Sequence, residues 1–175
     1  LNKRGIKAIF LDPKDIIYGS DSPAGALILP ESTDNLRREI IPRGLSEEYV
    51  VVIPGFYCFT KNGDVVTLPR GGSDTTGSFA AHALDALLYE NYTNDVIRRV
   101  SPDVVEDALQ LEKITYYEAL ELAYMGFGIL KEEAIVPCME KLIPIHVINT
   151  LTPERRTKIL AYRNPDGYDV TGIAY

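Results

Sequence analysis

The amino-acid sequence predicts an α/β fold, a three-layer αβα sandwich with a mostly parallel sheet. Two observations lead to this class. Apolar runs with strand composition alternate with segments of helical periodicity, which is typical of parallel strands joined by helices. The chain has 175 residues, of which 46% are hydrophobic, and this is enough for a substantial core.

Short apolar runs in the first part of the chain predict β-strands at residues 6–11, 26–29, 49–53, 56–60 and 65–68. The run 49–53 is continuously apolar, so we expect this strand to be buried on both faces. Lys61-Asn62-Gly63-Asp64 separates the last two runs. It predicts an antiparallel hairpin, because Asn-Gly supplies the positive φ angles of hairpin turns.

Two helices are expected in the same part of the chain. Ser32 or Thr33 can cap the first helix, which ends at Pro42 and Gly44. Its apolar face is formed by Leu36, Ile40 and Ile41. The second helix is expected over residues 75–84, directly after a glycine-rich segment.

The second part of the chain continues the alternation. Residues 86–89 and 143–148 predict strands, and residues 131–142 predict a helix. Thr115 and Glu118 have the spacing of a capping box, which opens a further helix reaching about residue 124. The acidic residues of these helices are expected to form a solvated face; they are Glu118, Glu121, Glu132 and Glu133.

Composition and charge exclude several classes of protein. The net charge of −7, without a cluster of lysine or arginine, argues against a surface for nucleic acid or for an anionic membrane. No apolar run approaches the roughly 20 residues of a membrane span. Cys58 and Cys138 lack metal-type spacing and are expected to be small buried residues in a reducing cytoplasm. His82 and His146 lie in apolar segments and are expected to be structural.

The segment from Arg70 to Asp74 has the composition of an anion-binding turn. It follows a predicted strand and precedes a predicted helix, where backbone N–H groups and the helix dipole favour phosphate or carboxylate. Arg70 is a bidentate anion donor, and Gly71 and Gly72 allow a ligand to approach the backbone. The alternative is a tight turn in which Ser73 or Asp74 only caps the helix.

Ligands of doubly wound sheets bind beyond the carboxyl ends of the strands, so we expect three turns to converge there. They cover residues 70–74, 91–95 and 126–128. Thr93, Asn94 and Asp95 can hydrogen-bond a nucleotide, or can simply close a loop.

Four segments resemble the aspartate kinases of the amino-acid kinase superfamily. Residues 52–74 contain Thr67-Leu68-Pro69-Arg70-Gly71-Gly72-Ser73-Asp74, which is similar to the family's T-L-x-R-G-G-S-D core. Residues 88–93, 114–124 and 143–150 are similar to the family's E-x-[WF]-T turn, I-S-Y-x-E-A-x-E-L-A helix and I-P-V-x-V-x-N-T strand. The resemblance implies an amino-acid kinase-like fold, here as a partial domain.

The resemblance also implies an activity, the transfer of phosphate from MgATP to the side-chain carboxylate of L-aspartate, giving 4-aspartyl phosphate for lysine, threonine and methionine synthesis. By this resemblance the catalytic residues are Asp74, Gly71 and Gly72, aspartate is bound by Arg70 and Ser73, and the nucleotide is bound by Thr93, Asn94 and Lys131. ATP and Mg²⁺ are the implied cofactors, and no metal ligand is assigned to the chain.

This sequence departs from the family pattern at three positions. Asn94 and Gly128 stand where the family has aspartate and lysine, and Lys131 stands where it has histidine. With Gly128 in place of lysine, one positive charge is lost, and Lys131, Arg98 or Arg99 can supply a positive charge in its place. These departures keep a second hypothesis open, a degenerate homologue that binds nucleotide or amino acid and regulates without catalysis. A third is an amino-acid kinase acting on glutamate, carbamate or a nucleoside monophosphate.

The resemblance divides the chain at residue 160. Residues 1–160 are expected to be the carboxyl-terminal portion of the catalytic domain, and residues 161–175 a linker toward ACT regulatory domains. The family's amino-terminal K-F-G-G strand carries the phosphate-binding lysine and lies upstream of Leu1, so we expect this segment alone to be inactive. The family implies a cytoplasmic homodimer with a feedback amino acid bound at the ACT domains.

Overall fold

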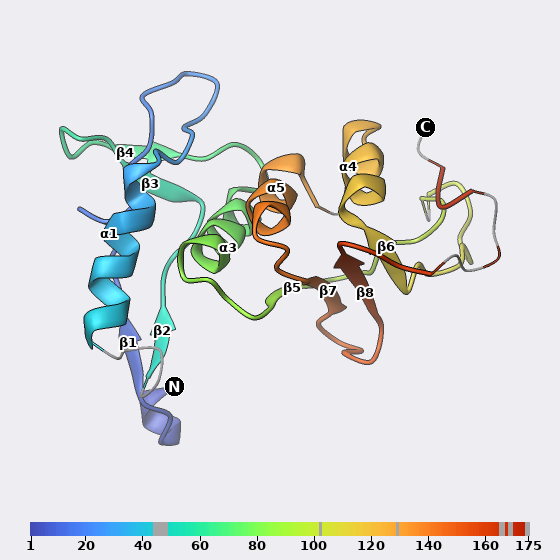
Figure 1. Ribbon diagram of the computed structural model, residues 1–175, viewed down its shortest axis with the longest axis horizontal. Helices are drawn as coiled ribbons and strands as arrows, with labels where there is room; N and C mark the ends of the chain where they lie inside the picture. The colour runs from blue at the N-terminus through green and yellow to red at the C-terminus, as the bar shows by residue number, and fades with distance from the viewer. Residues whose placement is uncertain (44–48, 102, 129, 165–166, 168–169, 174–175) are drawn as a thin grey trace. The chain divides into compact units, whose positions relative to one another are not determined.

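The computed structural model describes residues 1–43, 49–101, 103–128, 130–164, 167 and 170–173. Helices are interspersed with strands along the chain, which confirms the α/β class (Figure 1). The chain forms two compact units, the first spanning Leu1–Thr76 and the second Gly77–Tyr175. Each unit is described by itself below.

In its described residues, the first unit has two small sheets and the helix α1, and α3 begins at its end. Its elements are the 3-10 helix η1 (Asn2–Arg4), β1 (Ala8–Phe10), α1 (Glu31–Ile40), the 3-10 helix η2 (Ile41–Arg43), β2 (Val50–Val52), β3 (Tyr57–Phe59) and β4 (Val65–Thr67). Strands β1 and β2 pair in parallel, with Ala8 opposite Val50. Strands β3 and β4 pair antiparallel, with Tyr57 opposite Thr67. The predicted hairpin is therefore confirmed, and Gly63 in its loop has a φ of 91°.

Three predictions for the first unit are wrong. Residues 26–29 form no strand but only an isolated bridge between Gly19 and Ile28. Strand β2 is not buried on both faces, because Val50 is 47% exposed and Val52 is 40% exposed in their two-stranded sheet. An apolar run does not reveal how many faces of its sheet are covered.

The third correction concerns the start of α1. The helix begins at Glu31 with Pro30 as its N-cap, so neither Ser32 nor Thr33 caps it. The buried Ser32 hydroxyl instead accepts a hydrogen bond from the backbone N–H of Tyr18 at 2.9 Å. Leu36 and Ile40 are buried as expected. Ile41, in contrast, lies beyond the helix and is 57% exposed, and Gly44, which was expected to end the helix, lies outside the described residues.

The second unit is built on one sheet (Figure 1). Its elements are β5 (Tyr89–Thr93), β6 (Lys113–Thr115), α4 (Tyr116–Tyr124), α5 (Glu132–Glu140), β7 (Ile145–Asn149) and β8 (Arg156–Leu160), and α3 (Gly72–Ala83) enters it from the first unit. The order of the strands is β5-β7-β8-β6. The pairs β5–β7 and β6–β8 are parallel, and the central pair β7–β8 is antiparallel.

The core of the second unit lies where α4 and α5 pack against this sheet. Its fully buried members include Ile114, Ile135, Ile145, Val147 and Ile159. Side chains from β7 and β8 therefore supply much of the surface on which the helices rest. Cys138 is buried in the same core, and Cys58 is buried in the first unit, as predicted for both. No helix in the described part of the chain is both long and apolar enough to span a membrane.

Candidate active site

The glycine-rich turn lies in the first unit, between the end of β4 and the start of α3. Arg70 and Ser73 are exposed there, and Asp74 is partly buried. Gly71 has a φ of 89°, a left-handed conformation that glycine adopts without steric cost. The Gly71 carbonyl accepts the N–H groups of Asp74 at 3.0 Å and Thr75 at 3.1 Å, which starts the helix.

Helix α3 begins at Gly72, three residues earlier than the sequence predicted. Ser73 and Asp74 are therefore in the first helical turn and neither is the N-cap. The first backbone N–H groups of a helix have no acceptor within it and point along the axis with the positive end of the dipole. This is the arrangement of an anion-binding helix start, and it places Ser73 and Asp74 at that end.

Gly72 is required by packing. A Cβ atom built on Gly72 would lie 2.6 Å from the Leu68 Cβ and 3.1 Å from the Phe56 Cδ2. Gly72 is buried against its own unit on the side where a Cβ atom would stand, while its backbone N–H belongs to the first turn of α3. The two glycines thus have different tasks, a left-handed φ at Gly71 and a close backbone contact at Gly72.

A second group of predicted residues lies in the second unit, at the carboxyl end of β5. The expected turn at 91–95 is largely strand, because Asn91 and Thr93 both belong to β5. Thr93 Oγ1 donates to Asn94 Oδ1 at 3.2 Å. The carbonyl of Thr93 accepts two hydrogen bonds from Thr150, one from its N–H at 2.8 Å and one from its hydroxyl at 2.9 Å.

The neighbouring parallel strand β7 ends at the same place. Asn149 is paired with Thr93 in the sheet, and its Nδ2 donates to the carbonyl of Asn94 at 2.8 Å. Asn149 is buried, and its Oδ1 also accepts the N–H of Leu151 at 2.9 Å. Sequence reasoning did not name Asn149 and Thr150 as site residues. A polar pair directly after an apolar strand was the available signal.

Charged residues follow Asn94 in an ordered cluster. Asp95 accepts hydrogen bonds from Arg98, at 3.1 Å from Nε and 3.3 Å from Nη2, and lies 3.5 Å from Arg155 Nη2. Arg98 also donates to the carbonyl of Glu106 at 3.2 Å. Arg99 donates to the carbonyl of Val170 at 2.8 Å. Both arginines thus hold neighbouring chain segments, which leaves Lys131 as the simpler candidate for a cation facing phosphate.

Lys131 is exposed and occupies the N-cap position of α5 with no side-chain cap hydrogen bond. Gly128 is exposed, and Gly126 has a φ of 93°, so the preceding helix α4 is followed by a left-handed turn. Among the described residues, no group of three or more His, Cys, Asp or Glu side chains is placed to hold a metal ion.

The structure brings together Arg70, Gly71, Gly72, Ser73 and Asp74 in the first unit, and Thr93 with Asn94 in the second. Lys131 lies at a different turn of the second unit. The convergence of these three groups on one ligand remains a prediction.

The fold is that of an α/β protein, in which a glycine-rich turn leads directly into the first turn of helix α3. A model of the amino acid kinase family matches residues 1–149, and the chain belongs to this family. The chain is 39% identical over 174 residues to aspartokinase 3 of Bacillus subtilis, covering 98% of this chain and 37% of that protein.

Two solved structures are similar over nearly all of the chain. The first is Escherichia coli aspartokinase III in complex with aspartate and ADP in the R-state, with a TM-score of 0.85, 26% identity, and coverage of 93% of this chain and 37% of that one. The second is the aspartate kinase of Clostridium acetobutylicum, with a TM-score of 0.76, 37% identity, and coverage of 95% and 37%. The chain therefore spans little more than a third of the length of these relatives.

Proposed function

We propose that this chain is part of an aspartate kinase and contributes to phosphoryl transfer from MgATP to the side-chain carboxylate of L-aspartate. The observation that carries the proposal is the turn from Arg70 to Asp74, which opens helix α3 with a guanidinium and a hydroxyl exposed beside its N-terminus. The similarity to aspartokinases along the chain, including one solved with aspartate and ADP, supports it.

The first unit offers the groups that would bind the acceptor. Arg70 is suited to a carboxylate of the substrate aspartate, because a guanidinium binds a carboxylate through two parallel hydrogen bonds. Ser73 would donate a hydrogen bond to the same substrate. The backbone N–H groups of Gly71 and Gly72 would face the phosphoryl group in transfer, where the helix dipole stabilises negative charge.

The reaction needs no general base, because the side-chain carboxylate of aspartate is already ionised at neutral pH. One carboxylate oxygen forms a bond to the γ-phosphorus of ATP. The bond from that phosphorus to the bridging oxygen breaks, and its electron pair leaves with ADP. The protein contributes positioning and charge neutralisation, which is typical of phosphoryl transfer. Asp74 would orient a cation on the phosphate, and Mg²⁺ enters as part of the substrate MgATP.

The second unit offers the groups that would bind the nucleotide. Thr93 and Asn94 lie where β5 and β7 end together, and the hydrogen bonds from Asn149 and Thr150 hold both backbone carbonyls. Lys131 would neutralise phosphate from the start of α5. In the same proposal, residues 1–160 belong to the catalytic domain and residues 161–175 lead toward a regulatory domain.

An assay of the full-length gene product tests the proposal. ADP release is measured with aspartate and, as the matched control, with glutamate, and the acyl phosphate is trapped with hydroxylamine as a hydroxamate. We expect ADP release and hydroxamate with aspartate and neither with glutamate. A product that binds MgATP or aspartate in calorimetry but releases no ADP would instead identify a non-catalytic homologue, for which Asn94 and Gly128 are the motivating departures.

A further inference from the structure

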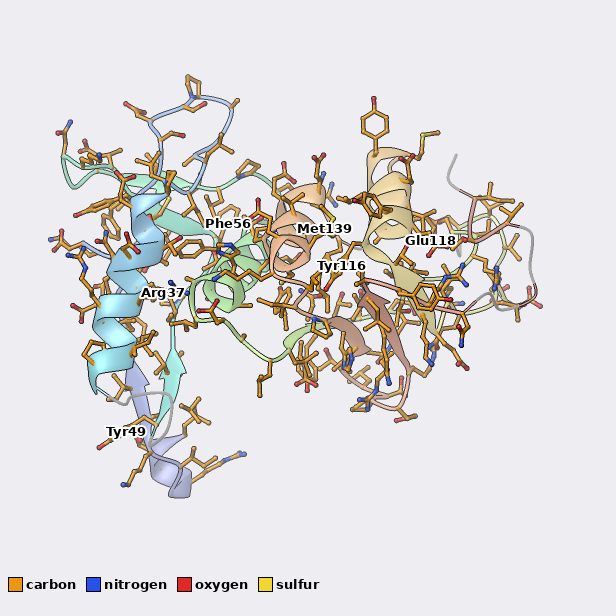
Figure 2. The ribbon with its side chains drawn as sticks, in the orientation of Figure 1. Arg37, Tyr49, Phe56, Tyr116, Glu118 and Met139 are labelled. Carbon is orange, nitrogen blue, oxygen red and sulfur yellow. The ribbon has the colours of Figure 1, made fainter. Side chains whose placement is uncertain are left out.

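Phe56 has an unusual backbone conformation beside the glycine-rich turn. Its φ is 78°, in the left-handed region that bulky residues rarely adopt. The side chain is 45% exposed, so burial of the ring does not account for the conformation (Figure 2). A strained backbone of this kind persists only where the surroundings fix it, and it is common near functional sites.

Phe56 holds both ends of the turn through its backbone. Its carbonyl accepts the N–H of Leu68 at 2.8 Å, two residues before Arg70. Its N–H donates to the Thr76 hydroxyl at 3.2 Å, three residues after Ser73. The segment from Leu68 to Thr76 contains every predicted residue of the turn. It is therefore hydrogen-bonded to Phe56 at both of its ends.

Thr76 is the connecting side chain in this arrangement. It is only 5% exposed, and its hydroxyl donates to the carbonyl of Gly72 at 2.8 Å while accepting from Phe56. The Thr76 hydroxyl thus donates one hydrogen bond within the helix and accepts one from the strained residue Phe56. Substitution by an apolar residue would leave the Phe56 N–H without this acceptor in a partly buried place.

The packing around this hydroxyl leaves little room for adjustment. A Cβ atom built on Gly55 would lie 3.1 Å from the Ser73 Cα and 3.4 Å from the Thr76 Oγ1. Gly55 and Gly72 therefore bring the Phe56 segment and the first turn of α3 into direct backbone contact. Ser73 and Thr76 both lie against Gly55 in the first turn of α3, so a change at Thr76 alters the packing that fixes Ser73.

We infer that Thr76 is a positioning residue for the aspartate-binding turn: its hydroxyl, bonded to Gly72 and Phe56, sets the place of Ser73 and Arg70. The inference rests on the proposed function, since it concerns the binding of aspartate. In this role Thr76 acts through its hydrogen bonds to the backbone of Gly72 and Phe56.

The test is steady-state kinetics of the full-length protein with Thr76→Val, which keeps the shape of the side chain and removes the hydroxyl. We expect the KM for aspartate to rise about tenfold, as for the loss of one hydrogen bond to a buried donor, and the KM for MgATP to change less than about twofold. Thr76→Ser keeps the hydroxyl and is expected to restore the KM for aspartate.

Thr75→Val is the matched control. Thr75 is the neighbouring residue of the same helix, and among the described residues its hydroxyl donates to the carbonyl of Gly71, at 3.4 Å, four residues earlier in the chain. We expect both KM values to stay at those of the unmodified protein. A purely structural role of Thr76 would lower the folded fraction, hence kcat, and would leave the KM for aspartate unchanged, which would overturn the inference.

Gly55→Ala tests the same contact from the opposite side if Thr76→Val does not fold. Its Cβ atom would press on the Ser73 Cα, so we expect a raised KM for aspartate with the Thr76 hydroxyl intact. An unchanged KM for aspartate in this folded variant would count against the inference. If the unmodified protein releases no ADP with aspartate, the proposed function itself fails, and the two failures are thus distinguishable.

Discussion

Glu118, at the start of helix α4 (Figure 2), forms a two-contact ion pair with Arg163 in the segment after β8. Arg163 Nε lies 2.9 Å from Glu118 Oε2, and Nη2 lies 2.5 Å from Oε1. Glu118 Oε1 also accepts from the Thr171 hydroxyl at 2.7 Å, and Oε2 accepts the N–H of Thr115 at 2.7 Å. The same carboxylate therefore completes the predicted capping box and holds the carboxyl-terminal segment.

The sequence-based expectation that Glu118 belongs to a solvated helix face is wrong. Its side chain is 26% exposed and that of Arg163 is 10% exposed. Glu118→Gln removes the charge and leaves the guanidinium without its counter-ion, so we expect the free energy of unfolding at pH 7 to fall by about 2 kcal/mol. Urea titration measures this. Glu121→Gln, on the exposed side of the same helix, is the control and is expected to change the free energy of unfolding by less than ~0.5 kcal/mol.

The same pair predicts a dependence of stability on pH. Hydrogen bonds from Arg163 lower the pKa of Glu118 from 4.5 to about 2, with further lowering by Thr171 and Thr115 against the opposing effect of burial. Because the folded-state pKa is depressed, the stabilisation is complete above about pH 4.5 and is lost as the pH falls toward 2. The difference in unfolding free energy between the unmodified protein and Glu118→Gln should shrink across this window. A constant difference would contradict the ion-pair explanation.

Thr157 provides a further prediction, on the stability of the second unit. Its buried hydroxyl on β8 donates to the carbonyl of Leu111 at 2.5 Å and accepts the N–H of Ile97 at 3.1 Å. Thr157→Val keeps the shape but leaves both backbone groups without this partner, so we expect a loss of about 2 kcal/mol in unfolding free energy. Thr67→Val, at an exposed position of β4, is the control, and we expect it to change the same quantity by less than ~0.5 kcal/mol. Equal losses in the two variants would refute the proposed role of the buried hydroxyl.

Elements with local chemical signals were predictable from the sequence. The hairpin loop contains Asn62-Gly63, and the capping box of α4 is specified by Thr115 and Glu118, which act within four residues of each other. Strands β6 and β8 were not predicted, since charged residues interrupt their apolar pattern and pairing in the sheet holds them there. Tertiary pairing of this kind leaves little trace in a short segment.

The candidate site was predictable to a similar extent. Arg70 and the two glycines predict a turn from their residue types alone, and the structure confirms that a helix starts there. Thr76 gave no signal, since a threonine inside a helix is ordinary and its partner Phe56 lies 20 residues away in the chain. Ser73 and Asp74 were placed outside the helix because a glycine pair usually marks its boundary, whereas Gly72 is already its first residue.

Arg70 and Asp74 are expected to differ in their kinetic effects. Under the proposed function, Arg70→Ala removes a charged, two-contact partner of the substrate, so we expect the KM for aspartate to rise about 100-fold with a smaller change in kcat. Asp74→Ala removes the carboxylate that would orient a cation on the phosphate, and we expect this change mainly to lower kcat. Steady-state kinetics of the full-length protein with varied aspartate measures both. Equal effects on both parameters in each variant would contradict the separate roles.

Asn149 gives the corresponding prediction for the nucleotide. Its Nδ2 holds the carbonyl of Asn94, and its Oδ1 accepts the N–H groups of Leu151 and Thr152, so it ties together the ends of β5 and β7. Asn149→Ala frees the Thr93–Asn94 segment, and we expect the KM for MgATP to rise about tenfold while the KM for aspartate stays within about twofold. Tyr92→Phe is the control, because the Tyr92 hydroxyl contacts only the exposed Glu90 among the hydrogen bonds identified for it. A rise in the KM for aspartate as large as that for MgATP would show that Asn149 supports the whole enzyme and has no particular role at the nucleotide.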